Sequence, residues 1–231
     1  MSIEILPDAE ALALRAADLF ALAAQEAAAA RGRFAAALSG GETPRALYRM
    51  LARQQFSQKI PWRRVQLYWG DERCVPPDDS ASNFGMARVA FLKHVPLPEA
   101  NVHRVHGEEE PGAAALSYEK ELRALAALER PKSELPVFDL VLLGLGGDGH
   151  TASLFPHGDA LTVAERFAVA TEAPDGSPRV ACGSWSAAST RPGWWPKSST
   201  ACACPRRCRR RACGRCTGSS RGCSTKRRRR S

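Results

Sequence analysis

The stretch FDLVLLGLGGDGHTASLFP at residues 138–156 constrains the fold more than any other part of the chain. Its first eight residues form an apolar run that is too short for a helix and is bounded by glycine, which predicts a strand covered on both faces in a parallel sheet. Four of the six positions 144–149 are glycine, namely Gly144, Gly146, Gly147 and Gly149. Because these positions carry no side chain, the backbone can turn sharply and its N–H groups can approach a ligand.

The same turn carries side chains that can transfer protons or donate hydrogen bonds. They are the carboxylate of Asp148, the imidazole of His150 and the hydroxyls of Thr151 and Ser153. We expect a helix to begin near Thr151, which would place free N–H groups and a positive dipole end beside the imidazole. The alternative is an ordinary glycine-rich connection whose histidine only caps the helix. The density of chemical groups favours a functional turn.

A second predicted strand, FAAAL at residues 34–38, leads into the turn SGGETP. Gly40 and Gly41 allow a tight turn, Thr43 is placed to cap the following helix, and Pro44 suits the first helical turn. A strand, a glycine turn and a new helix N-terminus together present N–H donors to a phosphate. Many connections in α/β proteins share this pattern, so it is weak evidence for phosphate binding when taken alone.

A third predicted strand, VQLYW at residues 65–69, is followed directly by charged residues. Ligands of open α/β sheets bind at this edge, beyond the carboxyl ends of the strands. Arg73 offers a planar fork to a phosphate or carboxylate, whereas Asp71 and Glu72 can act as a base or as orienting groups. Taken alone, the three residues also fit an ion-pair cluster on the surface.

The remaining elements are expected between these turns. We predict helices at residues 9–31, 45–53, 82–92 and 111–130, and short strands at 3–6 and 102–105. In the first helix Leu12, Leu19 and Leu22 share a face at helical spacing with Ala16 and Ala23, which predicts that this face packs on the core. His94, His103 and His106 are not spaced as a convincing metal site.

Charge and cysteine divide the chain into two parts. Residues 1–180 hold all 24 acidic residues and 19 of the 33 Lys and Arg residues, whereas residues 181–231 hold 14 basic residues and no acidic one. Cys74 is the only cysteine before residue 181, which suggests a reducing cytosol. The first residues have no basic segment, and no apolar run approaches the roughly 20 residues of a membrane helix, so we expect a soluble, unexported protein.

Three strand ends thus carry SGGETP, GDER and GLGGDGHTASLFP in that order, with SNF at residues 82–84 between the last two. In this combination, residues 1–180 resemble the 6-phosphogluconolactonase family of the pentose phosphate pathway. The related glucosamine-6-phosphate isomerases are similar in the SGG turn but typically carry a GHIAFNEP-like version of the last motif. They are the alternative family of enzymes.

The resemblance implies a three-layer α/β sandwich with a largely parallel sheet, of Rossmann-like type. It also implies hydrolysis of the lactone ester of a sugar phosphate in the cytoplasm, with no metal, no cofactor, no membrane and no specific nucleic-acid partner. His150 would be the acid/base that activates water, and Asp148 would orient or tune it. The residues implied to bind the substrate and its phosphate are Ser39, Gly40, Gly41, Thr43, Asp71, Arg73, Asn83 and Gly147.

Residues 181–231 depart from the resemblance, because they contain no Leu, Ile, Val, Met or Phe and cannot build a core. All but two of these 51 residues, Lys197 and Lys226, belong to types whose codons have G or C in the middle position. In a GC-rich gene, shifting the reading frame by one base places the G/C-rich wobble base there. We therefore interpret this tail as a frameshift product that begins near Val180 and is disordered.

Two functional interpretations of the tail compete with the frameshift. Its seven cysteines suggest a zinc module, but they lack paired CxxC motifs at a regular separation. Its arginines suggest a nucleic-acid arm, although such a segment binds polyanions without specificity. An inactive chain with a basic, polyanion-binding tail therefore remains an alternative to a lactone hydrolase.

Overall fold

The computed structural model describes residues 3–128 and 135–182. The helices of this part are α1 (Ala9–Arg31), α2 (Glu42–Leu51), α3 (Gln54–Ser57), α4 (Asn83–Ala90) and α5 (Pro111–Ala127). The strands are β1 (Phe34–Leu38), β2 (Val65–Trp69), β3 (Asp71–Arg73), β4 (Leu140–Val141), β5 (Ala168–Glu172) and β6 (Pro178–Cys182). None of the described helices is long and apolar enough to cross a membrane.

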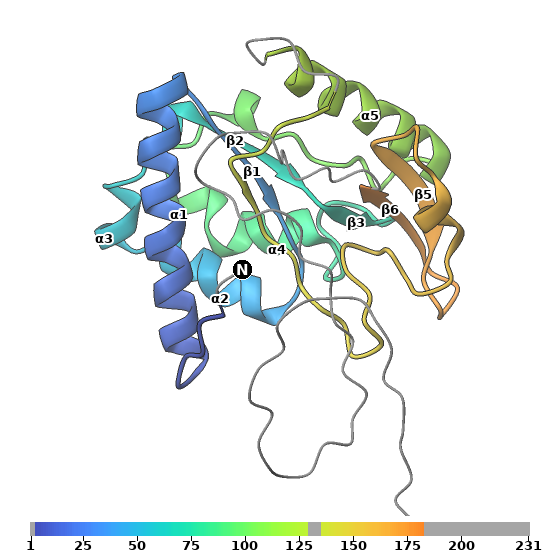
Figure 1. The fold of residues 1–231 in the computed structure, drawn as a ribbon, viewed down its shortest axis with the longest axis horizontal. Coiled ribbons are helices and arrows are strands. Elements are labelled where there is room, and N and C mark those ends of the chain that lie inside the picture. Colours follow the sequence, from blue (N-terminus) through green and yellow to red (C-terminus); the bar gives the residue numbers. More distant parts are fainter. Residues whose placement is uncertain (1–2, 129–134, 183–231) are drawn as a thin grey trace, which may run out of the picture. The chain divides into compact units, whose positions relative to one another are not determined.

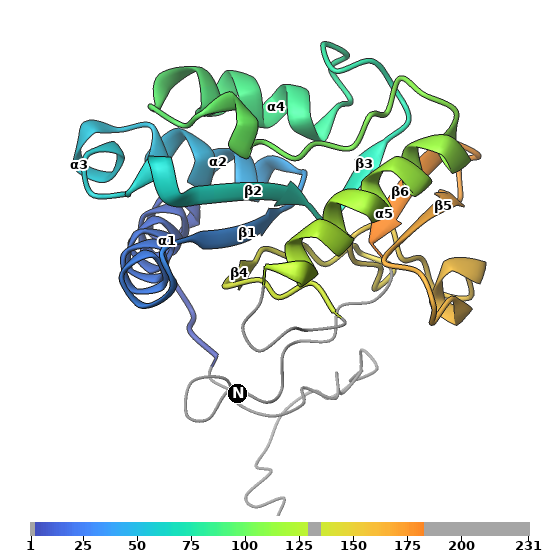
Figure 2. The ribbon, with the colours of Figure 1, turned by 90° about the horizontal axis from the view of Figure 1, so that it is seen from above.

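The central sheet is parallel, with the strand order β2-β1-β4 (Figure 2). One face of β1 presents Phe34, Ala36 and Leu38 to a core that α1, α2 and α4 complete. The other face presents Ala35 to a second core formed with α5. Figure 1 shows α1 and α5 on opposite sides of these strands. The described residues therefore form the predicted three-layer α/β arrangement with a parallel sheet.

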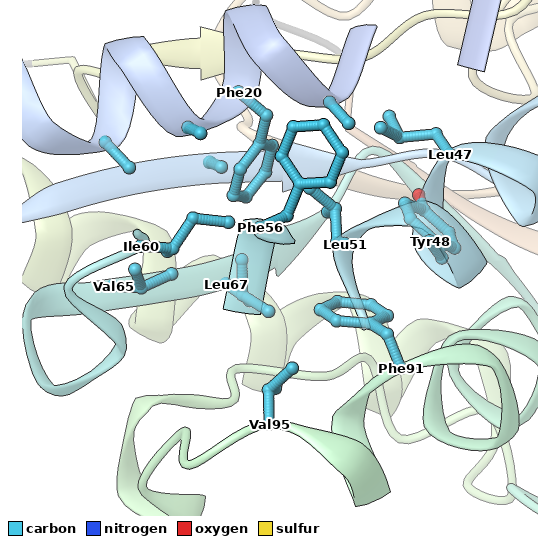
Figure 3. Packing of buried hydrophobic residues seen from close by; sticks show 14 of the residues in the cluster. Phe20, Leu47, Tyr48, Leu51, Phe56, Ile60, Val65, Leu67, Phe91 and Val95 are labelled. Carbon is cyan, nitrogen blue, oxygen red and sulfur yellow. The ribbon is translucent and has the colours of Figure 1, made fainter. Parts of the chain in front are cut away.

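The larger core is built around aromatic and aliphatic side chains from several elements (Figure 3). Phe20 of α1 meets Phe34 of β1 edge to face, with ring centroids 5.2 Å apart. Phe91, just after α4, packs against the ring of Tyr48 on α2 at 5.1 Å. Each such buried side chain stabilises the fold by roughly 1.5–3 kcal/mol relative to its exposed state. This core holds β1 and α2, and with them the SGGETP turn.

The prediction that Leu12, Leu19 and Leu22 of α1 face the core is wrong, although Ala16 and Ala23 of the same predicted face are partly buried against it. The helix begins at the Asp8 cap and ends at Gly32 as its sequence indicates, but Leu12, Leu19 and Leu22 are 41%, 43% and 48% exposed. The buried face consists of Phe20 and six alanines, Ala13, Ala17, Ala21, Ala24, Ala27 and Ala28. Alanine lets a helix approach its neighbours closely, so in this alanine-rich helix close packing, and not leucine spacing, selects the inner face.

A second, antiparallel sheet with the order β3-β6-β5 was not predicted. The chain passes into it at Gly70, directly after β2. The Gly70 N–H donates to the Leu38 carbonyl at 2.8 Å, and the Gly70 carbonyl accepts from the Cys182 N–H at 3.0 Å. Asp71, Glu72 and Arg73 are therefore strand residues and not a loop.

The strand predicted at residues 138–145 is much shorter and less buried than expected. Only Leu140 and Val141 pair with β1, and both are partly exposed. Leu143 is 53% exposed and Leu145 is 82% exposed. β4 is an edge strand, because no described strand pairs with its other side. The expectation of a strand covered on both faces is therefore not met within the described residues.

Several predicted boundaries also differ. Residues 3–6 form no strand, and residues 102–105 contribute only an isolated bridge between Leu67 and Val102. The second helix begins earlier than predicted, at Glu42, so Gly41 and not Thr43 is its N-cap. α4 opens at the predicted SNF motif but ends at Ala90, before a short 3-10 turn. The helix predicted at 111–130 ends at Ala127 with Leu128 as its C-cap, and positions 129 and 130 lie outside the described residues.

Candidate active site

Polar residues from the SGGETP turn, β3, the start of α4 and the His150 turn meet at the C-terminal edge of the parallel sheet. A Cβ atom on Gly40 would lie 1.9 Å from Oδ1 of Asn83, so the amide is packed directly against the SGGETP turn. The Asn83 amide nitrogen donates to the Asp71 main-chain carbonyl at 2.9 Å. Oδ2 of Asp71 accepts from the Ser153 hydroxyl at 2.5 Å, on the turn that carries His150. These contacts join motifs that are far apart in the sequence.

The imidazole of His150 is held by Asp148 from within the same turn. Nδ1 of the ring lies 2.6 Å from Oδ1 of Asp148, which also accepts from the His150 main-chain N–H at 3.1 Å. A carboxylate only accepts, so Nδ1 carries the proton in this bond and Nε2 is left as the basic nitrogen of the neutral ring. The two hydrogen bonds from His150 lower the pKa of the Asp148 carboxyl. Asp148 therefore stays ionised beside the imidazole.

Glycine at two positions of this turn lets the imidazole lie where it does and the backbone turn beside it. A Cβ atom on Gly146 would lie 2.2 Å from Nδ1 of His150, a distance that no side chain can adopt. Gly149 has a φ of 92°, which strongly favours glycine. The turn is closed by hydrogen bonds from the Gly146 N–H to the His150 carbonyl at 2.8 Å and from the Gly149 N–H to the Gly146 carbonyl at 3.0 Å.

The helix predicted to begin near Thr151 is absent from the described residues. Thr151 instead forms an isolated bridge with Leu154, and the residues between them make a turn. This bridge and the hydrogen bonds donated by Gly146 and Gly149 give residues 146–154 the form of an irregular loop. Its N–H groups therefore belong to a loop and add no helix dipole to the site.

The SGGETP turn presents the N-terminus of α2 to the same edge. Gly41 has a φ of 102° and caps α2 without a side-chain hydrogen bond. The Tyr48 hydroxyl anchors the turn, because it donates to the Ser39 carbonyl at 2.7 Å and accepts from the Ser39 N–H at 3.1 Å. Thr43 is exposed in the first turn of α2. The free N–H groups and dipole of this helix end suit an anion.

Asp71 and Glu72 have different surroundings, although they are neighbours on β3. Glu72 is 2% exposed and its carboxylate accepts from the N–H groups of Asn83 and Phe84 at 2.7 and 2.8 Å. It therefore adds to the Ser82 N-cap by binding the first two N–H groups of α4, and so has a structural role, unlike the base or orienting role considered from the sequence. Burial raises the pKa of the Asp71 carboxyl, while the Ser153 hydroxyl and nearby Arg73 partly oppose this shift.

Sequence reasoning missed Arg179, which lies on β6 directly opposite Arg73. Burial lowers the pKa of the Arg179 guanidinium, and the positive charge of Arg73 lowers it further. Like charges opposite one another in a sheet destabilise it unless an anion lies between them. The Arg73 guanidinium also donates to the Ala81 carbonyl. The two arginines and Asp71 form a charged group on the edge of the site.

The hairpin that carries Arg179 has one local signal in the sequence. Asp175-Gly176 between two short runs is a strong hairpin signal, and Gly176 indeed has a φ of 81°. That signal predicts the hairpin of β5 and β6 but not its pairing with β3.

Gly147 lies on the open side of the loop, because no atom lies within 4 Å of where its Cβ would stand. No described group of His, Cys, Asp and Glu is arranged to hold a metal ion.

Comparison with known proteins places this arrangement in a family. The family model described as glucosamine-6-phosphate isomerases/6-phosphogluconolactonase matches residues 7–190. The chain belongs to this family. Its glycine turns, Asp71, and the Asp148 and His150 pair all lie inside the matched residues.

Relatives within the glucosamine-6-phosphate isomerase/6-phosphogluconolactonase family are similar along most of the chain. The chain is 43% identical to a 6-phosphogluconolactonase of Nostoc sp. over 180 residues, which are 78% of this chain and 72% of the relative. It is 44% identical to that of Synechocystis sp., with 77% and 72% covered. The solved 6-phosphogluconolactonase of Trypanosoma cruzi superposes with a TM-score of 0.67 at 30% identity, covering 79% of this chain and 76% of that one.

Proposed function

We propose that this chain is a 6-phosphogluconolactonase, which hydrolyses 6-phospho-D-glucono-1,5-lactone to 6-phosphogluconate in the oxidative pentose phosphate pathway. The observation that carries the proposal is the 2.6 Å contact between Asp148 and His150 on a turn that belongs to the matched family region. A lactone is an activated ester, so a positioned base and a few N–H donors are sufficient for its hydrolysis.

In the proposed mechanism, Nε2 of His150 takes a proton from a water molecule as the water oxygen bonds to the lactone carbonyl carbon. The carbonyl oxygen becomes an oxyanion, which main-chain N–H groups of the Gly147 turn stabilise. When the ring C–O bond breaks, the imidazolium returns its proton to the departing alkoxide. Asp148 stabilises the transient imidazolium and keeps the proton of the neutral ring on Nδ1.

The phosphate is proposed to bind where N–H donors and arginines face one edge of the sheet. The turn and the N-terminus of α2, which has no side-chain cap, are supplied by Ser39, Gly40, Gly41 and Thr43. Arg73 and Arg179 supply charge, and a phosphate near them would relieve their mutual repulsion. Asp71 is proposed to accept a hydrogen bond from a sugar hydroxyl, and Asn83 holds Asp71 against the turn.

The alternative reaction is that of a glucosamine-6-phosphate isomerase. The matched family description contains both enzymes, so it does not separate them. The curated relatives at 43% and 44% identity are named 6-phosphogluconolactonases, which favours the lactone as substrate. The chain also has Thr151, Ala152 and Ser153 where the isomerases typically have IAF. We propose no specific nucleic-acid partner, and the single cysteine before residue 181 supports a cytoplasmic location.

The direct test is lactonase activity of the full chain and of His150→Ala. Freshly generated 6-phosphogluconolactone is followed by acid release at constant pH, with the uncatalysed rate subtracted. We expect His150→Ala to lower kcat by roughly 10²–10⁴-fold with the fold intact, because the general base is lost. His94→Ala, which removes an exposed histidine outside the site, is the matched control. Undiminished turnover by His150→Ala would rule out this role for His150.

A further inference from the structure

Ser153 makes a buried contact that the proposed mechanism does not use. Ser153 is only 5% exposed, and its hydroxyl donates to Oδ2 of Asp71 at 2.5 Å. A hydroxyl that donates to a carboxylate forms one of the stronger hydrogen bonds of proteins. Among the described residues, this is the side-chain hydrogen bond that links the His150 turn to β3.

The backbone at Ser153 adopts a conformation that is costly for a residue with a side chain. Ala152 has a φ of 48° and Ser153 a φ of 57°, both in the left-handed region. Such residues cost of order 1–3 kcal/mol each and persist only when their surroundings hold them. The Leu154 N–H, which donates to the Thr151 carbonyl at 2.8 Å, closes the turn around them. Glycine would fit this backbone more easily but would lack the hydroxyl.

We propose that Ser153 is a positioning residue for lactone hydrolysis, which fixes the Asp71 carboxylate and locks the His150 turn onto β3. The proposal rests on the proposed function, because it assigns Ser153 a role in the same site. Ser153 does not touch the reacting atoms in this role. It acts through Asp71, whose carboxylate interacts electrostatically with His150 and is proposed to hold the sugar.

The charged groups around Asp71 determine how the Ser153 hydroxyl affects the pKa of the Asp71 carboxyl. The groups that interact with its carboxylate are Glu72 and Arg73 of β3, Arg179 and Cys182 of β6, Tyr48 of α2 and His150 of the turn. Burial raises the pKa of Asp71, and the Ser153 hydrogen bond is the largest influence that lowers it. Removing the hydroxyl should therefore move the pKa of Asp71 further up, so that the carboxyl is protonated over a wider acidic range.

The test compares Ser153→Ala and Ser153→Gly with the unchanged full chain. Both variants lack the hydroxyl, but glycine relieves the strain of the backbone. We expect both to lose roughly tenfold or more in kcat with little change in KM, since a hydrogen bond to a charged group is lost. The acidic limb of kcat should move to higher pH in both. If Ser153→Gly keeps full activity and an unchanged pH profile, the role of Ser153 is structural and the proposal is overturned.

A matched control is available in the β5–β6 hairpin. The Ser177 hydroxyl also donates to an aspartate, Oδ1 of Asp175, at 2.5 Å, and this pair interacts with the site only through the charge of Asp175 near Arg179, not through Asp71. Ser177→Ala should leave kcat and its pH profile unchanged. In a double-mutant cycle, Ser153→Ala is also made in the Asp71→Asn variant. If Ser153 acts through Asp71, Ser153→Ala should cause no further loss of kcat there. Additive losses would contradict a role that acts through Asp71.

One measurement separates this proposal from the proposed function. The carboxyl carbon of Asp71 is titrated by NMR in the full chain and in Ser153→Ala, which needs no activity. An upward shift of the Asp71 pKa in the variant supports the contact even if the chain hydrolyses no lactone, in which case only the proposed function fails. An unchanged Asp71 titration overturns the role of Ser153 whatever the activity is.

Discussion

At the scale of the residue, the position of the His150 imidazole depends on a missing side chain. Gly146 leaves the space in which the ring lies against Asp148, because a Cβ there would be 2.2 Å from Nδ1. Gly144, in the same turn, has ordinary contacts, since its Cβ would lie 3.8 Å from the Ser39 hydroxyl. The space occupied by the imidazole therefore explains the glycine at position 146, whereas a Cβ atom would fit at position 144.

This difference predicts different effects for two alanine substitutions. Gly146→Ala should displace the imidazole and lower kcat by roughly tenfold to a hundredfold, because a small misplacement of a catalytic group is costly. Gly144→Ala should lower kcat by far less. Both effects are measured as kcat, with thermal unfolding to show that the variants fold. Equal effects of the two substitutions would show that the ring does not depend on the space at Gly146.

The pair of arginines gives a second prediction at this scale. Arg73→Ala should raise KM for the phosphorylated lactone by roughly tenfold to a hundredfold, since charged hydrogen bonds to the phosphate are lost. KM for unphosphorylated gluconolactone should change far less. Arg49→Ala, which removes an exposed arginine of α2, is the control. Equal changes for both substrates would place Arg73 outside the phosphate site.

At the scale of the element, the helix N-termini around the site are satisfied in different ways. Glu72 caps α4 from β3 and is almost fully buried. Glu42 lies in the first turn of α2, where its side chain is 79% exposed and pairs with Arg45 at 2.9 Å. The α4 cap thus ties a helix to the second sheet, whereas α2 keeps its N–H groups available.

Substitution of the two glutamates should separate these roles. Glu72→Ala should destabilise the chain by roughly 2–4 kcal/mol, because buried N–H groups lose their acceptor. Glu42→Ala should cost less than about 1 kcal/mol, as is usual for an exposed ion pair. Denaturant unfolding measures both values. If Glu72→Ala lowers the free energy of unfolding as little as Glu42→Ala does, the Glu72 carboxylate does not stabilise the N-terminus of α4.

At the scale of the whole molecule, the composition of residues 181–231 differs from that of the preceding residues, but the expectation that none of them contributes to a core is wrong for Ala181 and Cys182, which are buried in β6. The relatives from Nostoc and Synechocystis are matched over 72% of their length. At the described edge of the central sheet, β4 has an unpaired side and Leu143 and Leu145 are exposed. Such an edge favours association with other chains. We propose that the reading frame is lost near Val180 and that the original frame encodes apolar segments.

The codon pattern makes this proposal testable. Trp194 is encoded by TGG, so under the shift its first two bases end an original codon for Leu, Val or Met. Trp195 then restores Val, and its last base with the start of the Pro196 codon restores Ala. Sequencing the gene and adding or removing one base near codon 180 should give an open frame that reads apolar-Val-Ala at 194–196, within one codon. Early stop codons in that frame would refute the frameshift.

The amino-acid sequence by itself determined the strands β1 and β2, the bounds of α1 and the motifs that meet at the site. Local rules suffice there, because short apolar runs, glycine turns and caps act between neighbouring residues. The tertiary structure alone decided that the leucines of α1 face outward, that Glu72 caps α4 and that Arg179 lies opposite Arg73. These depend on which surfaces pack together, and the competition between alternative packings leaves no signal in the spacing of residues along the chain.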